Sequence, residues 1–207
     1  MKNELTYDQM RLLFTRIPAI ETDRLLLRRL RMSDLRDMYT YASDPAVAEH
    51  VLWHAHTSLS DTKVQLRGAI RQYRRGDPSS WAIVLKSTGH MVGTIGFMWV
   101  NAEHQTGEIG YSLARSCWNQ GVMTEAVQAV LGFAFDRLGL NRVEAQHETI
   151  NPASGRVMQK CGMRLEGILR DRVRNKGVYR DTALYSILKS EYIDHAADSS
   201  PSSPVTE

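Results

Sequence analysis

The spacing of hydrophobic residues follows two different periods along the chain, and each period predicts a different kind of element. A period near 3.6 residues predicts helices with one buried side, and a period of two predicts half-buried strands. The predicted strands cover residues 24–30, 80–86, 90–100, 106–114, 142–149, 163–174 and 178–188. The predicted helices cover residues 32–45, 59–78, a hydrophobic stripe over 126–138, and 151–162. This order predicts a mixed α/β fold with a largely antiparallel sheet and one central crossover.

Local signals at the ends of the two early helices support this interpretation. Ser33 is a suitable N-cap for the first helix, which Pro45 ends. Ser60 or Asp61 would cap the second helix, whose predicted buried stripe is Val64, Leu66, Ile70 and Tyr73.

The two ends of the chain depart from this pattern. Residues 1–20 predict an N-terminal arm with a short surface helix that Pro18 ends. Residues 193–207 are predicted to form a disordered tail, because their last part is rich in Ser and Pro and has Val205 as its only large hydrophobic residue. One domain over residues 21–192 lies between them, as the chain length of 207 residues favours.

Composition and charge narrow the class of protein. The chain is 43% hydrophobic and 24% charged, which is typical of a globular protein, and its net charge of +3 is too small to predict a nucleic-acid partner. No run of ~18 hydrophobic residues predicts a membrane span, and the first residues lack the pattern of a secretion signal. Cys117 and Cys161 form no metal-binding motif, so we expect reduced thiols, no metal and a cytoplasmic location.

The stretch "SCWNQGVMTEAVQAVLGFAF", residues 116–135, carries the first sign of chemistry. A polar loop with Gly121 lies between a predicted strand and a predicted helix. The N-terminus of a helix presents free N–H groups and a positive dipole end, and a glycine lets a phosphate approach them closely. Either this loop binds an anion, or Gly121 only eases a tight turn. It is neither a Walker loop nor a dinucleotide-binding motif.

Several motifs occur together in one order. They are "ETDRLLLRRLRMSDL", "VGTIGF", "GEIGYSLARSCWNQGVMTEAV", "LGLNRVEAQHETINPASGRVMQKCGMRLEGILRD" and "GVYRDTALYSIL". As an ensemble they resemble the GNAT N-acetyltransferases, in the branch of the ribosomal-protein N-terminal acetyltransferases, over residues 21–192. The resemblance implies the GNAT acyl-CoA N-acyltransferase fold, with helices on both faces of the sheet, and acetyl-CoA as co-substrate.

The resemblance also implies a binding site for acetyl-CoA. The family's pyrophosphate loop, [QR]-x-x-G-x-[GA], falls on residues 118–123, where only Gly121 matches and Met123 replaces a small residue. Backbone N–H groups would make most of the contacts there. The implied binding residues are Asn119, Gln120, Gly121, Val122, Met123 and Thr124. The pantetheine arm would lie between strands 107–114 and 142–149, beside the backbone of Leu113.

The family's Asn-x-x-Ser motif falls on Asn151 and Ser154. By resemblance, Asn151 would bond the pantetheine amide and Ser154 would lie near the thioester sulfur or the phosphates. Asn151 is also a good helix N-cap, and both roles are compatible. The family's frequent tyrosine acid falls on Met158, so either Ser154 replaces it or the thiolate leaves unassisted.

Glu108 is the candidate base for acetyl transfer, on the strand that the resemblance places beside the acetyl group. A peptide α-amine titrates near ~7.7–8.0, so a carboxylate that acts through water suffices to deprotonate it. A backbone N–H in the strand split is the expected oxyanion donor. The alternative is a structural carboxylate, bonded to an arginine across the sheet.

Other polar residues admit two interpretations each. Trp53 and His54, with His56, either line the acceptor site or form a loop in which Trp53 packs on the core. His147 is interpreted as a satisfied buried histidine. The basic residues of the last hairpin are interpreted as a solvated face; they are Arg170, Arg172, Arg174 and Lys176.

These observations predict an acetyl-CoA-dependent N-acetyltransferase that acts by direct attack of a primary amine in a ternary complex. The expected acceptor is a protein or peptide N-terminus, of the ribosomal-protein type, and the expected assembly is a monomer or homodimer. The alternatives are an acetyltransferase for small amines, such as polyamines, amino acids or antibiotics, and a non-catalytic acyl-CoA-binding module. No membrane or direct nucleic-acid partner is expected.

Overall fold

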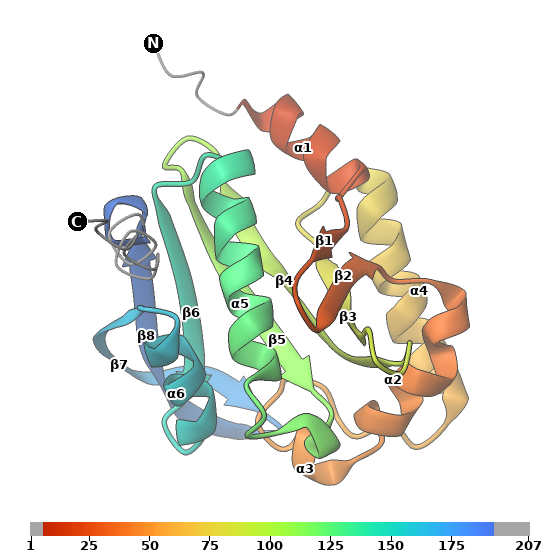
Figure 1. Ribbon diagram of the computed structural model, residues 1–207. Coiled ribbons are helices and arrows are strands. Elements are labelled where there is room, and N and C mark those ends of the chain that lie inside the picture. Colours follow the sequence, from red (N-terminus) through yellow and green to blue (C-terminus); the bar gives the residue numbers. More distant parts are fainter. Residues whose placement is uncertain (1–5, 193–207) are drawn as a thin grey trace, which may run out of the picture.

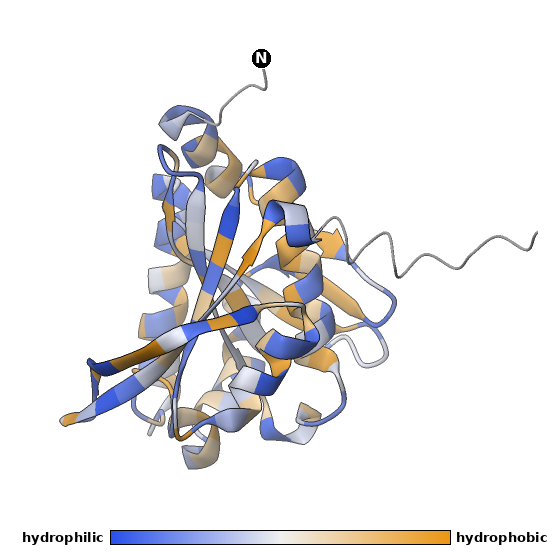
Figure 2. Ribbon diagram, turned by 90° about the vertical axis from the view of Figure 1, so that its left-hand side faces the viewer, coloured by the Kyte–Doolittle hydropathy of each residue, from blue (hydrophilic) through white to orange (hydrophobic). Residues whose placement is uncertain are grey.

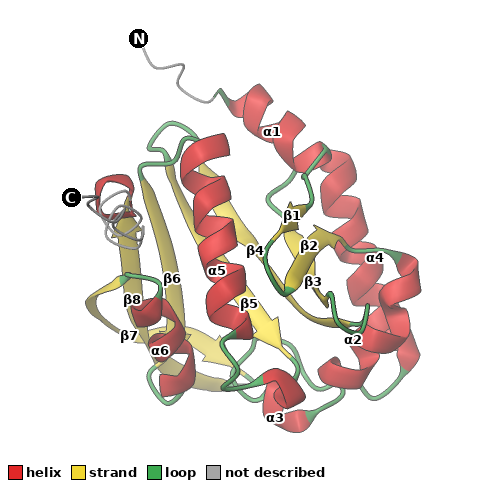
Figure 3. Cartoon of the chain, viewed as in Figure 1, coloured by secondary structure: helices red, strands yellow, loops and turns green. Residues whose placement is uncertain are grey.

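The computed structural model describes residues 6–192, and an eight-stranded sheet lies at its centre (Figures 1 and 3). The strand order is β1-β2-β3-β4-β5-β6-β8-β7. The strands are β1 (Ile20–Glu21), β2 (Leu25–Arg29), β3 (Ser80–Leu85), β4 (Met91–Asn101), β5 (Thr106–Leu113), β6 (Arg142–Glu148), β7 (Arg164–Asn175) and β8 (Val178–Leu188). Every neighbouring pair is antiparallel except β5 and β6. This confirms the predicted mixed sheet with one central crossover, because parallel neighbours need a long connection.

Helices cover both faces of the sheet. They are α1 (Tyr7–Thr15), α2 (Leu35–Ala42), α3 (Pro45–Ala48), α4 (Leu59–Arg75), α5 (Val122–Gly132) and α6 (Pro152–Lys160). Tyr41 of α2 contacts Ser112, whereas the adjacent Tyr111 contacts Ser154 of α6. Since successive strand residues point to opposite faces, α2 and α6 lie on opposite sides.

Figure 2 shows hydrophobic positions gathered on the inner strands. Among residues 6–192, no helix has the length and hydrophobicity to cross a membrane.

The start of α4 differs from the predicted cap and stripe. Ser58 is the N-cap, and its side chain and Asp61 form a capping box, so the cap precedes the predicted Ser60 or Asp61 while the helix begins at Leu59, the first residue of the predicted range. Val64 is 66% exposed, and the buried position one turn before Leu66 is Thr62 instead. Thr62 is tolerated in the core because its hydroxyl bonds His56 Nδ1 at 2.8 Å. The N-cap of α2 also differs from the prediction, because it is Asp34 and not Ser33.

The N-terminal arm packs into the same core as the rest of the fold. Phe14 of α1 is fully buried, and its ring meets Phe97 edge-on at 5.7 Å between centroids. The Arg11 guanidinium donates to the carbonyl of Arg75 at the end of α4, at 2.9 Å. The predicted surface helix is therefore a core element. The predicted disorder of 193–207 concerns residues outside the described range.

Candidate active site

A cleft opens where β5 and β6 diverge. The two strands share only three register pairs, the last of which joins Glu108 to Glu144. Beyond that pair the cleft has a volume of about 580 Å³. Its walls come from β5, the end of β6, the first turn of α5, one side of α6 along its length, and the segment that carries Glu49 and His50. The resemblance predicted a split between these two strands, and the structure shows one.

The loop before α5 takes a backbone shape that frees N–H groups. Asn119 and Gly121 both have left-handed backbone conformations, with φ of 59° and 75°. Gly121 is the N-cap of α5 and supplies no side-chain acceptor, so the first N–H groups of the helix have no side-chain cap. Val122, Met123 and Thr124 follow and line the cleft, as do Leu113, Asn119 and Gly121. A helix N-terminus of this kind attracts an anion.

An ion pair braces this loop from outside. The Arg24 guanidinium bonds Glu125 of α5 at 2.6 Å and also donates to the carbonyl of Gln120 at 3.0 Å. Burial tends to raise the pKa of Glu125, but the hydrogen bonds from Thr22 and Arg24 outweigh it and lower that pKa. The Gln120 side chain turns back to the carbonyl of Ser116, so it does not line the cleft. Sequence reasoning did not single out Arg24.

Two basic residues that the sequence analysis missed lie on the opposite wall. Arg156 and Lys160 of α6 both line the cleft. Their spacing of four residues puts them on one side of the helix, which is the signal that could have found them. Together with the α5 N-terminus they make the cleft favourable to phosphate groups.

The start of α6 joins the cleft to β5 through two hydroxyl groups. Asn151 caps the helix by accepting from the backbone N–H of Ser154 at 3.4 Å, as its capping interpretation predicted. The Ser154 hydroxyl lies 2.9 Å from the hydroxyl of Tyr111. Burial raises the pKa of Tyr111, so this phenol keeps its proton at neutral pH. The sequence analysis did not single out Tyr111, whereas Met158, at the family's tyrosine position, is buried in the core.

Glu108 lies at the point of divergence, on the sheet face opposite Tyr111. Its two carboxylate oxygens accept from Trp99 Nε1 and Gln146 Nε2, each at 3.0 Å. The Trp99 contact exists because Met98 is an extra residue in β4, which brings Trp99 opposite Glu108. Glu108 does not line the cleft described above, and no arginine bonds it within residues 6–192.

Met123, which replaces a small residue of the family's pyrophosphate loop, points largely into the core rather than into the loop. Its side chain is only 5% exposed and belongs to the hydrophobic core. Helix periodicity explains this, because Met123 and Val127 are four residues apart and both are buried. Met123 therefore contributes both to the core and to the cleft wall.

The residues proposed to line the acceptor site lie elsewhere. Trp53 packs on the core and on the ring of His56, with 5.4 Å between centroids, and His54 is exposed. Neither lines the cleft. His50, three residues earlier, does line it. His147 was expected to be satisfied, but only its Nδ1 has a partner, the carbonyl of Glu148 at 2.7 Å.

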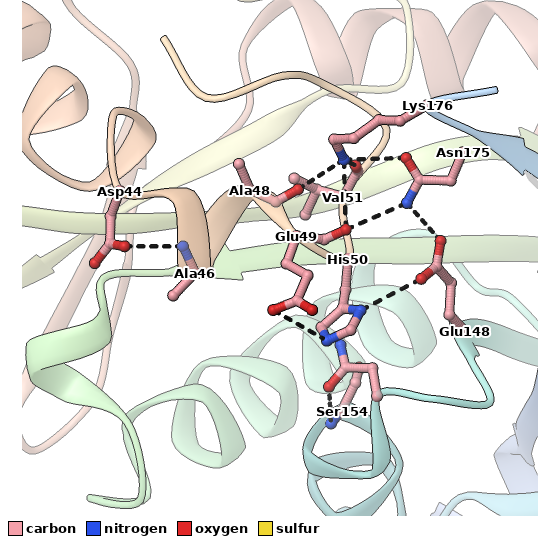
Figure 4. A network of polar contacts seen from close by, with 11 residues as sticks. Asp44, Ala46, Ala48, Glu49, His50, Val51, Glu148, Ser154, Asn175 and Lys176 are labelled. Carbon is pink, nitrogen blue, oxygen red and sulfur yellow. Dashed lines mark hydrogen bonds and ion pairs between the residues drawn. The ribbon is translucent and has the colours of Figure 1, made fainter. Parts of the chain in front are cut away.

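A polar network fixes the segment that carries His50 (Figure 4). Lys176, in the turn between β7 and β8, donates to the carbonyls of Ala48 at 2.8 Å and Val51 at 2.7 Å. Asn175 donates to the buried carboxylate of Glu148, and His50 Nδ1 lies 3.3 Å from the other oxygen of that carboxylate. The hairpin turn thus holds the rim of the cleft. The four basic residues of the hairpin are exposed, as the interpretation of a solvated face expects, and Lys176 makes these contacts in addition.

The two cysteines are free and buried, and Cys117 lines the cleft. Burial raises the pKa of the Cys161 thiol to about 12, which makes it a poor nucleophile. Cys161 is therefore a packing residue of the hydrophobic core.

Known sequences match this chain over most of its length. A model of the acetyltransferase (GNAT) domain matches residues 24–164. An uncharacterized N-acetyltransferase of Bacillus licheniformis is 33% identical over 174 residues, which cover 84% of this chain and 98% of that protein. The ribosomal-protein-serine acetyltransferase of Escherichia coli is 29% identical over 129 residues, which cover 62% of this chain and 71% of that protein.

Solved structures agree with these matches. A GNAT-family acetyltransferase from Bacillus anthracis has a TM-score of 0.75 and 28% identity, and the match covers 84% of this chain and 99% of that one. RimL, a ribosomal-protein α-N-acetyltransferase solved in complex with coenzyme A, has the same fold, with a TM-score of 0.75 and 23% identity over 83% of this chain and 98% of that one. With its diverging strands, its uncapped helix N-terminus and these relatives, the chain belongs to the GNAT family of N-acetyltransferases.

Proposed function

We propose that this N-acetyltransferase uses acetyl-CoA to acetylate the α-amine of a protein or peptide N-terminus in the cytoplasm. The observation that carries the proposal is the cleft between β5 and β6, which ends on the uncapped N-terminus of α5. A pyrophosphate fits that end because it is anionic, and an extended pantetheine arm fits an unpaired strand edge. The coenzyme A complex of RimL is consistent with this use of the fold.

The loop before α5 and the helix α6 bind different parts of acetyl-CoA. Backbone N–H groups of residues 119–124 hold the pyrophosphate, and Arg156 and Lys160 add positive charge on the facing wall. The strand edge near Leu113 pairs with the pantetheine arm, and Asn151 bonds one of its amides. The capping bond leaves Asn151 its side-chain NH₂ for this role.

Acetyl transfer then needs a base, an oxyanion donor and an acid. Glu108 accepts the proton of the nitrogen through water, and a backbone N–H of β5 stabilises the oxyanion. Ser154 protonates the departing thiolate as the Tyr111 hydroxyl passes its own proton to the serine oxygen across their 2.9 Å contact, and Tyr111 then takes a proton back from solvent in the cleft. This pair supplies the acid that the family's tyrosine position, here Met158, lacks.

Two arguments favour an α-amine over a lysine side chain. A neutral amine is needed for attack, and the α-amine titrates about 2.5 units below the lysine amine. The E. coli relative is named as a ribosomal-protein-serine acetyltransferase. Together they support an N-terminal acceptor of the ribosomal-protein type.

The test is the release of free coenzyme A thiol across a panel of amines. The panel contains peptides with different N-termini, lysine peptides, polyamines and aminoglycosides. The proposal expects the fastest release with N-terminal peptides and a dissociation constant for acetyl-CoA that calorimetry can measure. Absence of acetyl-CoA binding at millimolar ligand would overturn it.

A small polyamine is the second candidate acceptor. The observation in its favour is the carboxylate of Glu49, which is exposed at the rim of the cleft beside His50. A carboxylate there attracts a cationic chain as well as an N-terminus. Faster thiol release with polyamines than with peptides in the same panel would select this acceptor.

The two basic residues of α6 that line the cleft, Arg156 and Lys160, lead to a separate prediction about acetyl-CoA affinity. Removing both charges in Arg156→Gln/Lys160→Gln should weaken acetyl-CoA binding by about tenfold at low salt, because each exposed charge pair contributes up to ~1 kcal/mol. Added salt should narrow the difference from the unaltered protein. Calorimetric titration at two ionic strengths measures both effects.

The matched control is Lys63→Gln/Arg67→Gln on α4. These two residues have the same four-residue spacing, are exposed and do not line the cleft. Their removal should leave the affinity unchanged. An equal loss in both double variants would show a general charge effect and contradict a phosphate-binding role for α6.

A further inference from the structure

One wall of the cleft holds a histidine, His50, whose ring contacts a buried carboxylate. His50 Nδ1 lies 3.3 Å from Glu148 Oε2, and Glu148 is only 5% exposed. A buried carboxylate needs polar partners, and here Asn175 and His50 supply them. The carboxylate favours the ring tautomer with the proton on Nδ1, so Nε2 keeps a free lone pair.

Hydrogen bonds at the rim of the cleft hold the backbone on both sides of His50 (Figure 4). Lys176 holds the carbonyls of residues on both sides of His50, Ala48 and Val51. Asp44 caps the short helix before it by accepting from the N–H of Ala46 at 2.9 Å. His50 lines the cleft and its side chain is 23% exposed, so one ring can reach both a bound molecule and solvent.

His50 also lies on the side of the sheet that carries Glu108. Gln146 and Glu148 are two residues apart on β6, so they point to the same face at a spacing of about 6.6 Å. Gln146 bonds Glu108 and Glu148 bonds His50. The carboxylates of Glu108 and Glu148 therefore lie on the same face of the sheet, and they have different hydrogen-bond partners. Glu108 has two neutral donors, whereas Glu148 has a side chain that can carry a proton away.

Acetyl transfer from a protonated amine requires that two protons leave the nitrogen, and a base must accept each of them. The N–C bond forms, the C–S bond breaks, and the nitrogen of an ammonium group loses two protons. One proton balances the proton that the sulfur gains, and the other leaves to solvent. The first must be removed before attack, and the second leaves the tetrahedral adduct.

We propose that His50, oriented by Glu148, removes the first proton from the incoming ammonium group and passes it to solvent. This inference rests on the proposed function, in which Glu108 removes the second proton. Nε2 accepts the proton, and the resulting imidazolium lies between Glu148 and Glu49, whose Oε2 is 4.0 Å from Nε2. Histidine suits this step because it exchanges its proton near neutral pH.

Other charged groups around the ring set the local field. They are Glu49 and Glu148 beside it, Lys176 behind its backbone, and His147, Arg156 and Lys160 among the residues that line the cleft. The Lys176 ammonium faces carbonyl oxygens and Asn175 Oδ1, so its charge is largely satisfied. The two carboxylates are the charges nearest to the ring nitrogens.

The test compares rates against pH for His50→Gln, which keeps a donor toward Glu148 but cannot take up a proton. At about pH 7 the variant should lose roughly 5- to 10-fold in kcat/KM for the amine, because an α-amine with a pKa of ~7.7–8.0 is already neutral in about one molecule in 6 to 11 at that pH. At about pH 9 the α-amine is already neutral, so the variant should come within about threefold of the unaltered protein. A merely structural role would give a loss that does not depend on pH.

Two further variants show whether a loss of rate in His50→Gln comes from lost chemistry or from a changed structure. His104→Gln changes an exposed histidine in the turn before β5 and should behave as the unaltered protein at every pH. His50→Ala should regain rate at about pH 7 when imidazole is added, which separates chemistry from misfolding. An unchanged rate in His50→Gln, or an equal loss at both pH values, would overturn the assignment of His50. No thiol release from the unaltered protein with any amine would instead overturn the proposed function.

Discussion

Glu108→Gln should lower kcat/KM for the amine by about 100-fold near neutral pH and leave acetyl-CoA binding unchanged. Glutamine keeps the size of the side chain but cannot accept the second proton of the nitrogen. The contacts with Trp99 and Gln146 hold the carboxylate at the point where β5 and β6 part. Thiol release gives the rate, and calorimetric titration gives the affinity for acetyl-CoA.

Unlike the loss in His50→Gln, this loss should persist at high pH. A neutral amine still has to shed a proton after it attacks the thioester, so raising the pH does not replace Glu108. Glu103→Gln, in the exposed turn between β4 and β5, is the matched control and should keep the full rate. A full rate in Glu108→Gln would show that this carboxylate only ties β4 to β6.

Met123→Ala should lower the free energy of unfolding by about 2–5 kcal/mol. Met123 is buried in the core, and truncation of a buried methionine removes hydrophobic contacts and leaves a cavity. Met123→Leu conserves the volume and should cost less than ~1.5 kcal/mol. Urea denaturation followed by circular dichroism measures both changes.

The same variants separate two views of the phosphate loop. If Met123 crowds the loop, Met123→Ala raises acetyl-CoA affinity without a loss of stability. If Met123 anchors α5, stability falls and the affinity of the remaining folded protein stays within a few fold. Met32→Ala, at a position 40% exposed, controls for a general effect of losing a methionine. The burial of Met123 leads us to expect the second result.

The local backbone geometry of several residues that line the cleft was predictable from the sequence. Gly121 precedes a helix with a clear hydrophobic stripe, and a positive φ at such a glycine is a local property of the turn. Asn151 before Pro152 predicts a helix cap in the same local way, and the structure confirms it. The strand predicted at 106–114 is β5, because a period of two over several residues is a strong signal.

Other features depended on contacts between distant parts of the chain. Thr22 and Arg24 brace α5 across about a hundred residues, and no local pattern predicts that. The same holds for Thr62, a polar residue whose burial is possible only because His56 bonds it. Propensity and periodicity describe neighbours along the chain, whereas burial depends on what packs from elsewhere.

The sequence by itself determined the order of elements, the single parallel crossover and the loop that presents helix N–H groups, because these follow from periodicity, caps and glycine positions. Only the tertiary structure decided which polar groups work together. Tyr111 meets Ser154, and His50 meets Glu148, across separations of 43 and 98 residues. Such pairs form where strands diverge and where a hairpin turn closes over a short helix. These polar contacts of the cleft therefore come from packing between elements, which no single stretch of sequence encodes.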